Sequence, residues 1–140
     1  MLEILVWSRR QAETAEPIPG AYLISITEPG EYAALGCQPK DRYLRVQFSD
    51  IDRLDSRQSG QVITDQQAQE IARFVDRLPH HAEHLVIHCE HGRSRSPSVA
   101  MAVCDHLGLP RSQIGWSHPD AAPPNYLVYK MIRKALVECA

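Results

Sequence analysis

Residues 85–108 read LVIHCEHGRSRSPSVAMAVCDHLG, and this stretch gives the clearest indication of the fold class. It begins with an apolar run of strand length at residues 85–88 and continues through a short polar segment. Ser96 and Pro97 then open a helix that runs to about Leu107, because proline suits the first helical turn and Gly108 suits the stop. A buried strand, a polar turn and a helix in this order predict one unit of an α/β sheet.

The segments on either side repeat this alternation. Apolar runs of strand length occupy residues 2–7, 22–26 and 43–48. Ser8 is suited to cap a short helix, the Thr64 and Gln67 pair has the spacing of a capping box for a second, and a last helix starts near Pro124. A polar-rich stretch at residues 49–61 predicts a long surface loop. Strands alternating with helices predict a three-layer α/β sandwich, with a central, mainly parallel sheet of four to five strands flanked by helices.

Composition and charge limit the class of protein. The chain has 140 residues, 44% hydrophobic and 23% charged, which is typical of one globular domain over residues 1–140. A net charge of −2 favours neither a nucleic acid nor a membrane partner, so an anion site would have to be local. The apolar runs are too short to cross a bilayer, and the four widely spaced cysteines do not form a disulfide pattern. We therefore expect a cytoplasmic monomer with reduced thiols.

The polar segment between the strand and the helix contains the residue types of an anion site. Backbone N–H groups that lead into a helix N-terminus attract an anion. Such a loop also favours the thiolate form of Cys89, which stands at its base. The planar guanidinium of Arg95 matches two oxygens of a phosphate, and Gly92 permits a tight turn with close approach of the backbone. A thiolate, an amide cradle and an arginine together indicate nucleophilic attack on phosphorus.

The order of these residues resembles a known signature. His88 and Cys89, five further residues, and then Arg95 and Ser96 give the pattern H-C-x5-R-S. This pattern is similar to the phosphate-binding signature of the protein tyrosine phosphatase superfamily. The G-x-S-R-S-P spelling that starts at Gly92 looks most like its small, bacterial-type dual-specificity branch.

The resemblance extends on both sides of the signature. Upstream, Tyr-Leu-Arg-Val at residues 43–46 leads to Asp50, where the small dual-specificity branch places its general-acid aspartate. Downstream, Pro-Asn-Tyr at residues 124–126 opens the last helix, as in many small members, and makes Asn125 a supporting residue. The acid precedes the cysteine in the chain, whereas the low-molecular-weight phosphatases have the opposite order.

The resemblance implies a cysteine-phosphatase fold and a role for each residue. Cys89 is expected to form a phosphocysteine, Arg95 to bind the phosphate, and Ser96 to hydrogen-bond the sulfur. Asp50 would protonate the leaving oxygen and then activate water, and His88 would support the loop through backbone contacts. The resemblance implies no metal and no organic cofactor. The remaining residues of the phosphate-binding loop would be Glu90, His91, Gly92, Arg93 and Ser94.

Two site assignments have alternatives. Asp52 and Asp55 lie in the same polar loop as Asp50 and could be the general acid instead; Asp50 is favoured because the end of a strand fixes its position. The cluster of His80, His81, His84, His88, Cys89 and His91 could instead be a zinc site. A solvated turn is favoured for His80, His81 and His84, because no second Cys/His pair stands at finger-like spacing.

The sequence thus predicts a cysteine-dependent phosphomonoesterase, a protein tyrosine or dual-specificity phosphatase that acts on a phosphorylated protein or peptide. Hydrolysis of a phosphoinositide or an RNA 5′-triphosphate on the same loop is an alternative, as is non-catalytic binding of phosphoproteins. Arg93 resembles the basic loops of some phosphoinositide phosphatases, whereas the acidic Glu90 does not. The short segment before Asp50 leaves little room for a loop that would deepen the pocket, so we expect a shallow site, with Trp116 as a candidate wall.

Overall fold

The computed structural model describes residues 2–36, 38–52, 60–118 and 121–139. Within these residues the chain forms a single five-stranded sheet in the order β3-β2-β4-β1-β5, in which every neighbouring pair is parallel. The carboxyl ends of all strands therefore meet at one edge of the sheet. The strands are β1 (Glu3–Ser8), β2 (Tyr22–Thr27), β3 (Tyr43–Gln47), β4 (His84–Cys89) and β5 (Ile114–Gly115).

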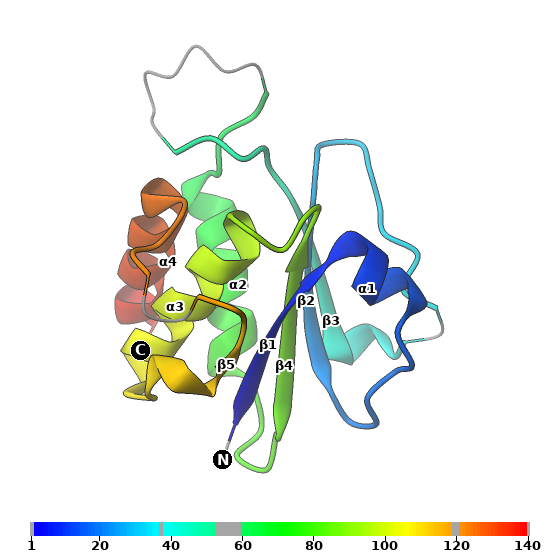
Figure 1. Cartoon of the computed structure of the whole chain (residues 1–140). Coiled ribbons are helices and arrows are strands. Elements are labelled where there is room, and N and C mark those ends of the chain that lie inside the picture. Colours follow the sequence, from blue (N-terminus) through cyan, green and yellow to red (C-terminus); the bar gives the residue numbers. More distant parts are fainter. Residues whose placement is uncertain (1, 37, 53–59, 119–120, 140) are drawn as a thin grey trace.

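Helices cover both faces of this sheet. Figure 1 shows α1 on one face and the three longer helices together on the other. Helix α4 packs against both α2 and α3, and α3 lies against β4. The α/β class and the three-layer arrangement are confirmed, and the sheet expected to be mainly parallel is parallel throughout the described residues. The helices are α1 (Arg9–Thr14), α2 (Asp65–Asp76), α3 (Arg95–Leu107) and α4 (Tyr126–Cys139).

Strand β4 and helix α3 form the centre of the protein. Strand β4 lies between β2 and β1, and all of its residues after His84 are buried, as expected for an apolar strand covered on both faces. The first ten residues of α3, Arg95 to Cys104, are also all buried. Burial raises the pKa of Cys104 to about 11, so this thiol stays protonated at neutral pH. Because the first turns of α3 are buried, the polar side chains of Arg95, Ser96 and Ser98 lie inside the protein.

Local sequence signals fix the ends of the helices. The predicted capping box is present at Thr64 with Gln67, and Ser8, predicted as an N-cap, also forms a capping box with Gln11. Gly108 ends α3 in the left-handed conformation with φ of 69°. Helix α3 begins one residue before the predicted start, and α4 begins two residues after it. The two-residue β5 was not predicted, because so short a strand leaves no periodic pattern.

None of the helices in the described ranges combines the length and the apolar character needed to cross a membrane.

Candidate active site

Cys89 is the last residue of β4 and therefore lies at the carboxyl edge of the sheet, where open α/β sheets bind ligands. Its side chain is 2% exposed, and its Sγ lies 3.2 Å from the Oγ of Ser96 in the first turn of α3. The predicted nucleophile and the predicted sulfur partner are thus together at the base of one loop. A hydroxyl at this distance can donate a hydrogen bond to a thiolate.

The loop between β4 and α3 carries backbone donors that lack backbone acceptors. In the described part of the chain, no backbone carbonyl accepts a hydrogen bond from the N–H groups of residues 91–94. The side chain of Ser94, the N-cap of α3, does not cap the helix. Unpaired N–H groups ahead of a helix N-terminus are suitable donors to an anion. The observed loop therefore has the donors that the sequence predicted for a phosphate.

Contacts on two sides hold the loop at Gly92. Its φ is +69°, and a Cβ added there would lie 2.9 Å from the carbonyl carbon and oxygen of Trp7, so only glycine lets the loop come this close to β1. On the other side, the indole Nε1 of Trp116 donates a hydrogen bond of 3.0 Å to the Gly92 carbonyl. Trp116, predicted as a wall of the site, thus also supports the loop directly.

His88 lies beneath the loop and is fully buried. Its Nε2 lies 2.6 Å from the Oγ of Ser25 on β2, and its Nδ1 lies 3.3 Å from the carbonyl oxygen of Cys89. A carbonyl oxygen can only accept, so the ring proton belongs on Nδ1 and Nε2 accepts from the serine. Burial lowers the pKa of His88, which keeps the ring neutral at neutral pH. The contact with the Cys89 carbonyl agrees with the predicted supporting role.

Arg95 is held on one side and free on the other. Its Nη1 donates to the Phe48 carbonyl at 2.8 Å and pairs with Oε1 of Glu28 at 3.3 Å. Its Nε is buried and has no hydrogen-bond partner among the described residues. The side chain is only 6% exposed, so the guanidinium is fixed in orientation while one of its donors has no acceptor among the described residues.

Glu28 is a site residue that the sequence interpretation missed. It follows the last residue of β2, and its Oε2 accepts a hydrogen bond of 2.7 Å from Ser49, beyond the end of β3. The available signal was its position, since polar residues after neighbouring parallel strands meet at one edge of the sheet. Glu28 thereby connects the buried Arg95 to the ends of two strands.

Asp50 lies at the rim of the loop, as predicted for the general acid. Its Oδ1 accepts hydrogen bonds from Ser94 Oγ at 2.7 Å and from Asn125 Nδ2 at 2.8 Å. Asn125 is fully buried, and its Oδ1 accepts from the backbone N–H of Val128 at 3.0 Å. A rigid amide at the start of α4 thus holds an exposed carboxylate beside the loop. The structure brings Asp50, Asn125 and the signature together.

The alternatives to this arrangement gain no support. Asp52 is exposed and makes no hydrogen bond to another described residue, whereas Asp55 lies outside the described residues. No cluster of three or more His, Cys, Asp or Glu side chains that could hold a metal ion is present in the part of the chain that the structure describes. The zinc hypothesis for His80, His81 and His84 therefore has no geometric basis there.

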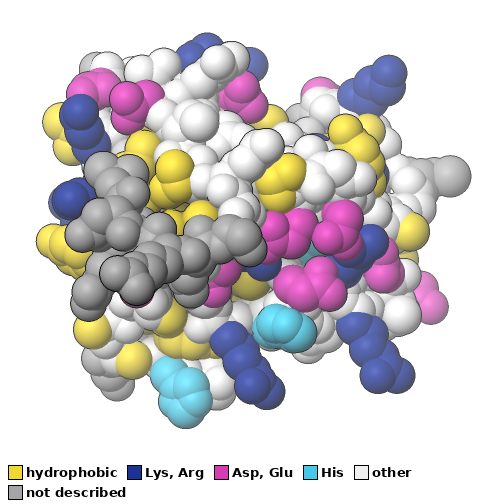
Figure 2. All heavy atoms as spheres, turned by 90° about the horizontal axis from the view of Figure 1, so that it is seen from above, with side chains coloured by type: hydrophobic (Ala, Val, Ile, Leu, Met, Phe, Trp, Pro, Cys, Tyr) yellow, Lys and Arg dark blue, Asp and Glu magenta, His cyan; other side chains and the backbone are white. Residues whose placement is uncertain are grey.

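Charged side chains surround the loop at this edge of the sheet. Figure 2 shows acidic and basic groups gathered close together near the middle of this face. Arg9 is the centre of one group, with its guanidinium 3.2 Å from Glu13, 2.9 Å from Glu31 and 3.6 Å from Glu90. The Glu90 side chain is therefore engaged by Arg9, so Glu90 can serve a bound anion only through its backbone. The side chains of His91 and Arg93 are exposed.

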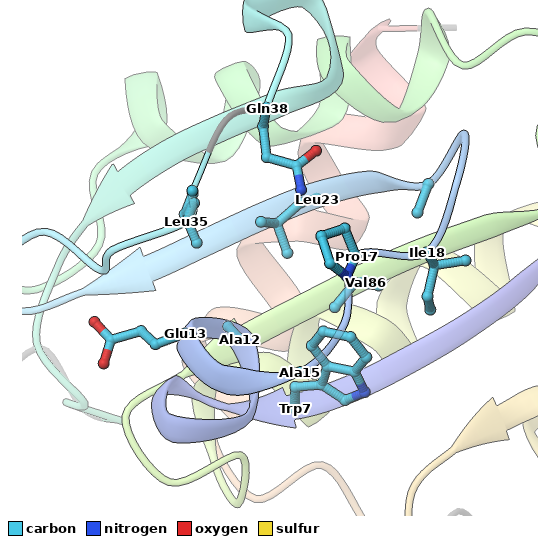
Figure 3. A pocket seen from close by; sticks show the side chains of 12 residues that line it. Trp7, Ala12, Glu13, Ala15, Pro17, Ile18, Leu23, Leu35, Gln38 and Val86 are labelled. Carbon is cyan, nitrogen blue, oxygen red and sulfur yellow. The ribbon is translucent and has the colours of Figure 1, made fainter.

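A separate apolar pocket lies on the α1 face of the sheet. Figure 3 shows Trp7, Leu23 and Val86 projecting from three strands toward α1 and the Pro17 segment that follows it. The cavity is about 230 Å³ in volume, which is smaller than most ligand pockets. Cys89 does not line it, so the candidate active site is confined to the carboxyl edge.

No protein-family model matches this chain, and no curated protein is significantly similar to it. A function for this chain therefore has to be inferred from the geometry of the loop.

Proposed function

We propose that the protein is a cysteine-dependent phosphomonoesterase of the protein tyrosine phosphatase superfamily, with the corresponding cysteine-phosphatase fold. The observation that carries this proposal is a buried thiol at the base of a loop whose donors lack acceptors. These donors are the N–H groups of residues 91–94 and the Nε of Arg95. A dianionic phosphoryl group would supply the missing acceptors directly above Cys89.

The proposed reaction proceeds in two displacements. The Cys89 thiolate attacks phosphorus, the bond between phosphorus and the ester oxygen breaks, and Asp50 gives its proton to the departing oxygen. Water then attacks the phosphocysteine, Asp50 takes a proton from it, and the sulfur leaves as a thiolate. Ser96 Oγ, 3.2 Å from the sulfur, stabilises that leaving thiolate by a hydrogen bond. Arg95 and the loop amides bind the phosphoryl oxygens in both steps.

The surroundings of the loop favour a phosphorylated peptide over a polyanion as substrate. Glu28, Glu31 and Glu90 all lie near the loop and engage Arg95 or Arg9. An inositol polyphosphate or an RNA 5′-triphosphate brings several negative charges and needs a larger excess of cations. A single phosphate ester on a protein side chain needs only the donors of the loop.

The test compares the wild type with Cys89→Ser and Asp50→Ala on p-nitrophenyl phosphate and on a phosphotyrosine peptide, with and without a chelator. We expect Cys89→Ser to abolish turnover on both substrates, because no nucleophile remains. Asp50→Ala should slow the peptide more than p-nitrophenyl phosphate, because p-nitrophenolate leaves without help from an acid. Cys139→Ser, at the half-buried end of α4, is the matched control and should stay active. Activity that survives Cys89→Ser and disappears with the chelator would contradict the proposal.

A further inference from the structure

A groove borders the phosphate-binding loop on the side of β1 and α1. It is a hollow of about 500 Å³. Its walls come from two segments, the start of α1 and the first half of the loop after Cys89. The charged and titratable residues that line it are Arg9, Arg10, Glu13, Glu90, His91 and Arg93.

The two walls are fixed to each other through the backbone. Ser8 is the parallel partner of Cys89 in the sheet, and the Arg9 N–H donates to the Glu90 carbonyl at 3.1 Å. Gly92 lies against the backbone of Trp7, as described above. Backbone contacts therefore define the shape of the groove, and one of its walls is the loop itself.

Two of the three arginines in this groove have no carboxylate partner among the described residues, whereas the third, Arg9, pairs with Glu31 as well as with both carboxylates of the groove. Its two carboxylates, Glu13 and Glu90, are both engaged by Arg9, at 3.2 Å and 3.6 Å. Arg10 and Arg93 are exposed, and neither forms an ion pair with a residue that the structure describes. One free arginine thus stands on each wall, next to the loop that would hold a phosphate.

We propose that Arg10 and Arg93 form a second anion subsite, which binds the carboxylate of an acidic residue beside the phosphorylated residue of a peptide substrate. This inference rests on the proposed function and adds a sequence preference to it. A guanidinium pairs well with a carboxylate, and a groove adjoining the phosphate site is where a flanking side chain would lie. Two arginines fall short of the roughly four to eight clustered basic residues that recognise an anionic lipid surface, so the geometry points to a peptide.

The experiment measures binding, so that it does not depend on turnover. Fluorescence anisotropy gives the affinity of Cys89→Ser for phosphotyrosine peptides with glutamate at the flanking positions and for matched peptides with glutamine there. We expect the glutamate peptides to bind more tightly, by about two- to fivefold for each arginine engaged. Arg10→Gln and Arg93→Gln, each added to Cys89→Ser, should each reduce that preference, and added salt should weaken it. Arg77→Gln, an exposed arginine after α2, is the matched control and should keep the preference.

Each outcome decides between the possibilities. Equal affinity for the two kinds of peptide, no binding of either, or a preference that persists in both arginine variants would overturn the subsite. Soluble inositol bisphosphate that binds more tightly than the acidic peptide, through Arg10 and Arg93, would overturn the choice of a peptide. Turnover by the wild type is measured separately. Hydrolysis of both peptides at equal rates would contradict only the subsite, whereas a lack of hydrolysis with the binding preference intact would contradict only the proposed catalysis.

Discussion

Arg111 and Arg95 differ in whether their guanidinium donors find hydrogen-bond acceptors. Arg111 donates to both carboxylate oxygens of Asp105, at 3.1 Å and 2.8 Å, and also to the Ala121 carbonyl. Arg95 is more deeply buried, with 6% of its side chain exposed against 28% for Arg111. Its Nε nevertheless has no acceptor among the described residues.

This difference is the one expected between a structural ion pair and the proposed binding site. A buried donor without an acceptor costs about 1–3 kcal/mol, so a fold retains one only where something else offsets that cost. The Asp105 cluster joins α3 to α4 through Tyr129, and both carboxylate oxygens of Asp105 accept hydrogen bonds. One donor of this cluster, the Nε of Arg133, is buried without a partner among the described residues. The loop after β4 has more unmatched donors, because the N–H groups of residues 91–94 lack backbone acceptors beside the unpaired Nε of Arg95. In this interpretation, the Asp105 cluster stabilises the fold and the loop is suited to bind an anion.

The largest effect on activity is expected when Arg95 and Arg111 are changed to lysine in two separate variants. Arg95→Lys keeps the charge but loses the planar fork, and we expect kcat/KM to fall by about 10²- to 10³-fold. Arg111→Lys should instead lower the free energy of unfolding while keeping kcat/KM. Both are measured on p-nitrophenyl phosphate and by urea unfolding. Equal losses of activity in the two variants would remove the distinction between the two sites.

The two regions should also respond to acid at different pH values. Burial holds the pKa of His88, beneath the loop, below the ordinary 6.5, so the unfolded chain takes up a proton there before the folded chain does. Stability should therefore fall as the pH drops below about 6.5, by at most about 1.4 kcal/mol per pH unit from this residue. The hydrogen bonds from Arg111 lower the pKa of Asp105. Its contribution is present above its unfolded value near 3.8 and is lost as the pH falls through the lower folded value.

Urea unfolding of His88→Asn from pH 7.5 to 5.5 measures the first of these responses. The variant should be less stable than the wild type at pH 7.5 but should lose less stability on acidification. His81→Asn, which changes an exposed histidine, is the control and should follow the wild type. An unchanged slope in His88→Asn would show that the acid response near neutral pH has another origin.

The smallest effect should come from the indole that holds the loop. Trp116→Phe keeps an aromatic ring but removes the indole N–H, and with it the hydrogen bond to the Gly92 carbonyl, which is 3.0 Å long in the wild type. We expect the inhibition constant for inorganic phosphate to rise by about two- to tenfold, the equivalent of one ordinary hydrogen bond. Trp7→Phe is the control, because the Trp7 side chain lines the pocket on the α1 face instead. Similar inhibition constants for both variants and the wild type would mean that the indole does not shape the loop.

Local patterns predicted the parts of the site that depend on neighbours in sequence. The strand, turn and helix around Cys89, the N-cap at Ser8, the capping box at Thr64 and the tight approach at Gly92 all follow from residue types at short spacing. Asp50, which the resemblance assigned, lies three residues after the end of β3 and accepts a hydrogen bond from Ser94 of the loop. These elements need no knowledge of what lies opposite them in the fold.

The parts that were missed depend on contacts between distant segments. Glu28 reaches Arg95, and Arg9 reaches Glu31 and Glu90, across the edge of the sheet. Such pairs leave no periodic pattern, since each partner is an ordinary charged residue in a loop or at the start of a helix. The strand order of a parallel sheet decides which loops meet, and that order cannot be read from the hydrophobic pattern alone.

Strand β1 precedes the other strands in the chain but pairs only with late ones. Glu3 lies opposite His84, and Ile4 lies opposite Ile114. While the chain is being synthesised, β1 thus has no partner until β4 has emerged, whereas β2 and β3 can pair much sooner. Because Gly92 rests on the backbone of β1, the loop acquires its shape only after this late pairing. A nascent chain in which β1 is still unpaired therefore holds Cys89 without the backbone support at Gly92, and the proposed phosphate-binding loop is complete only when the sheet is.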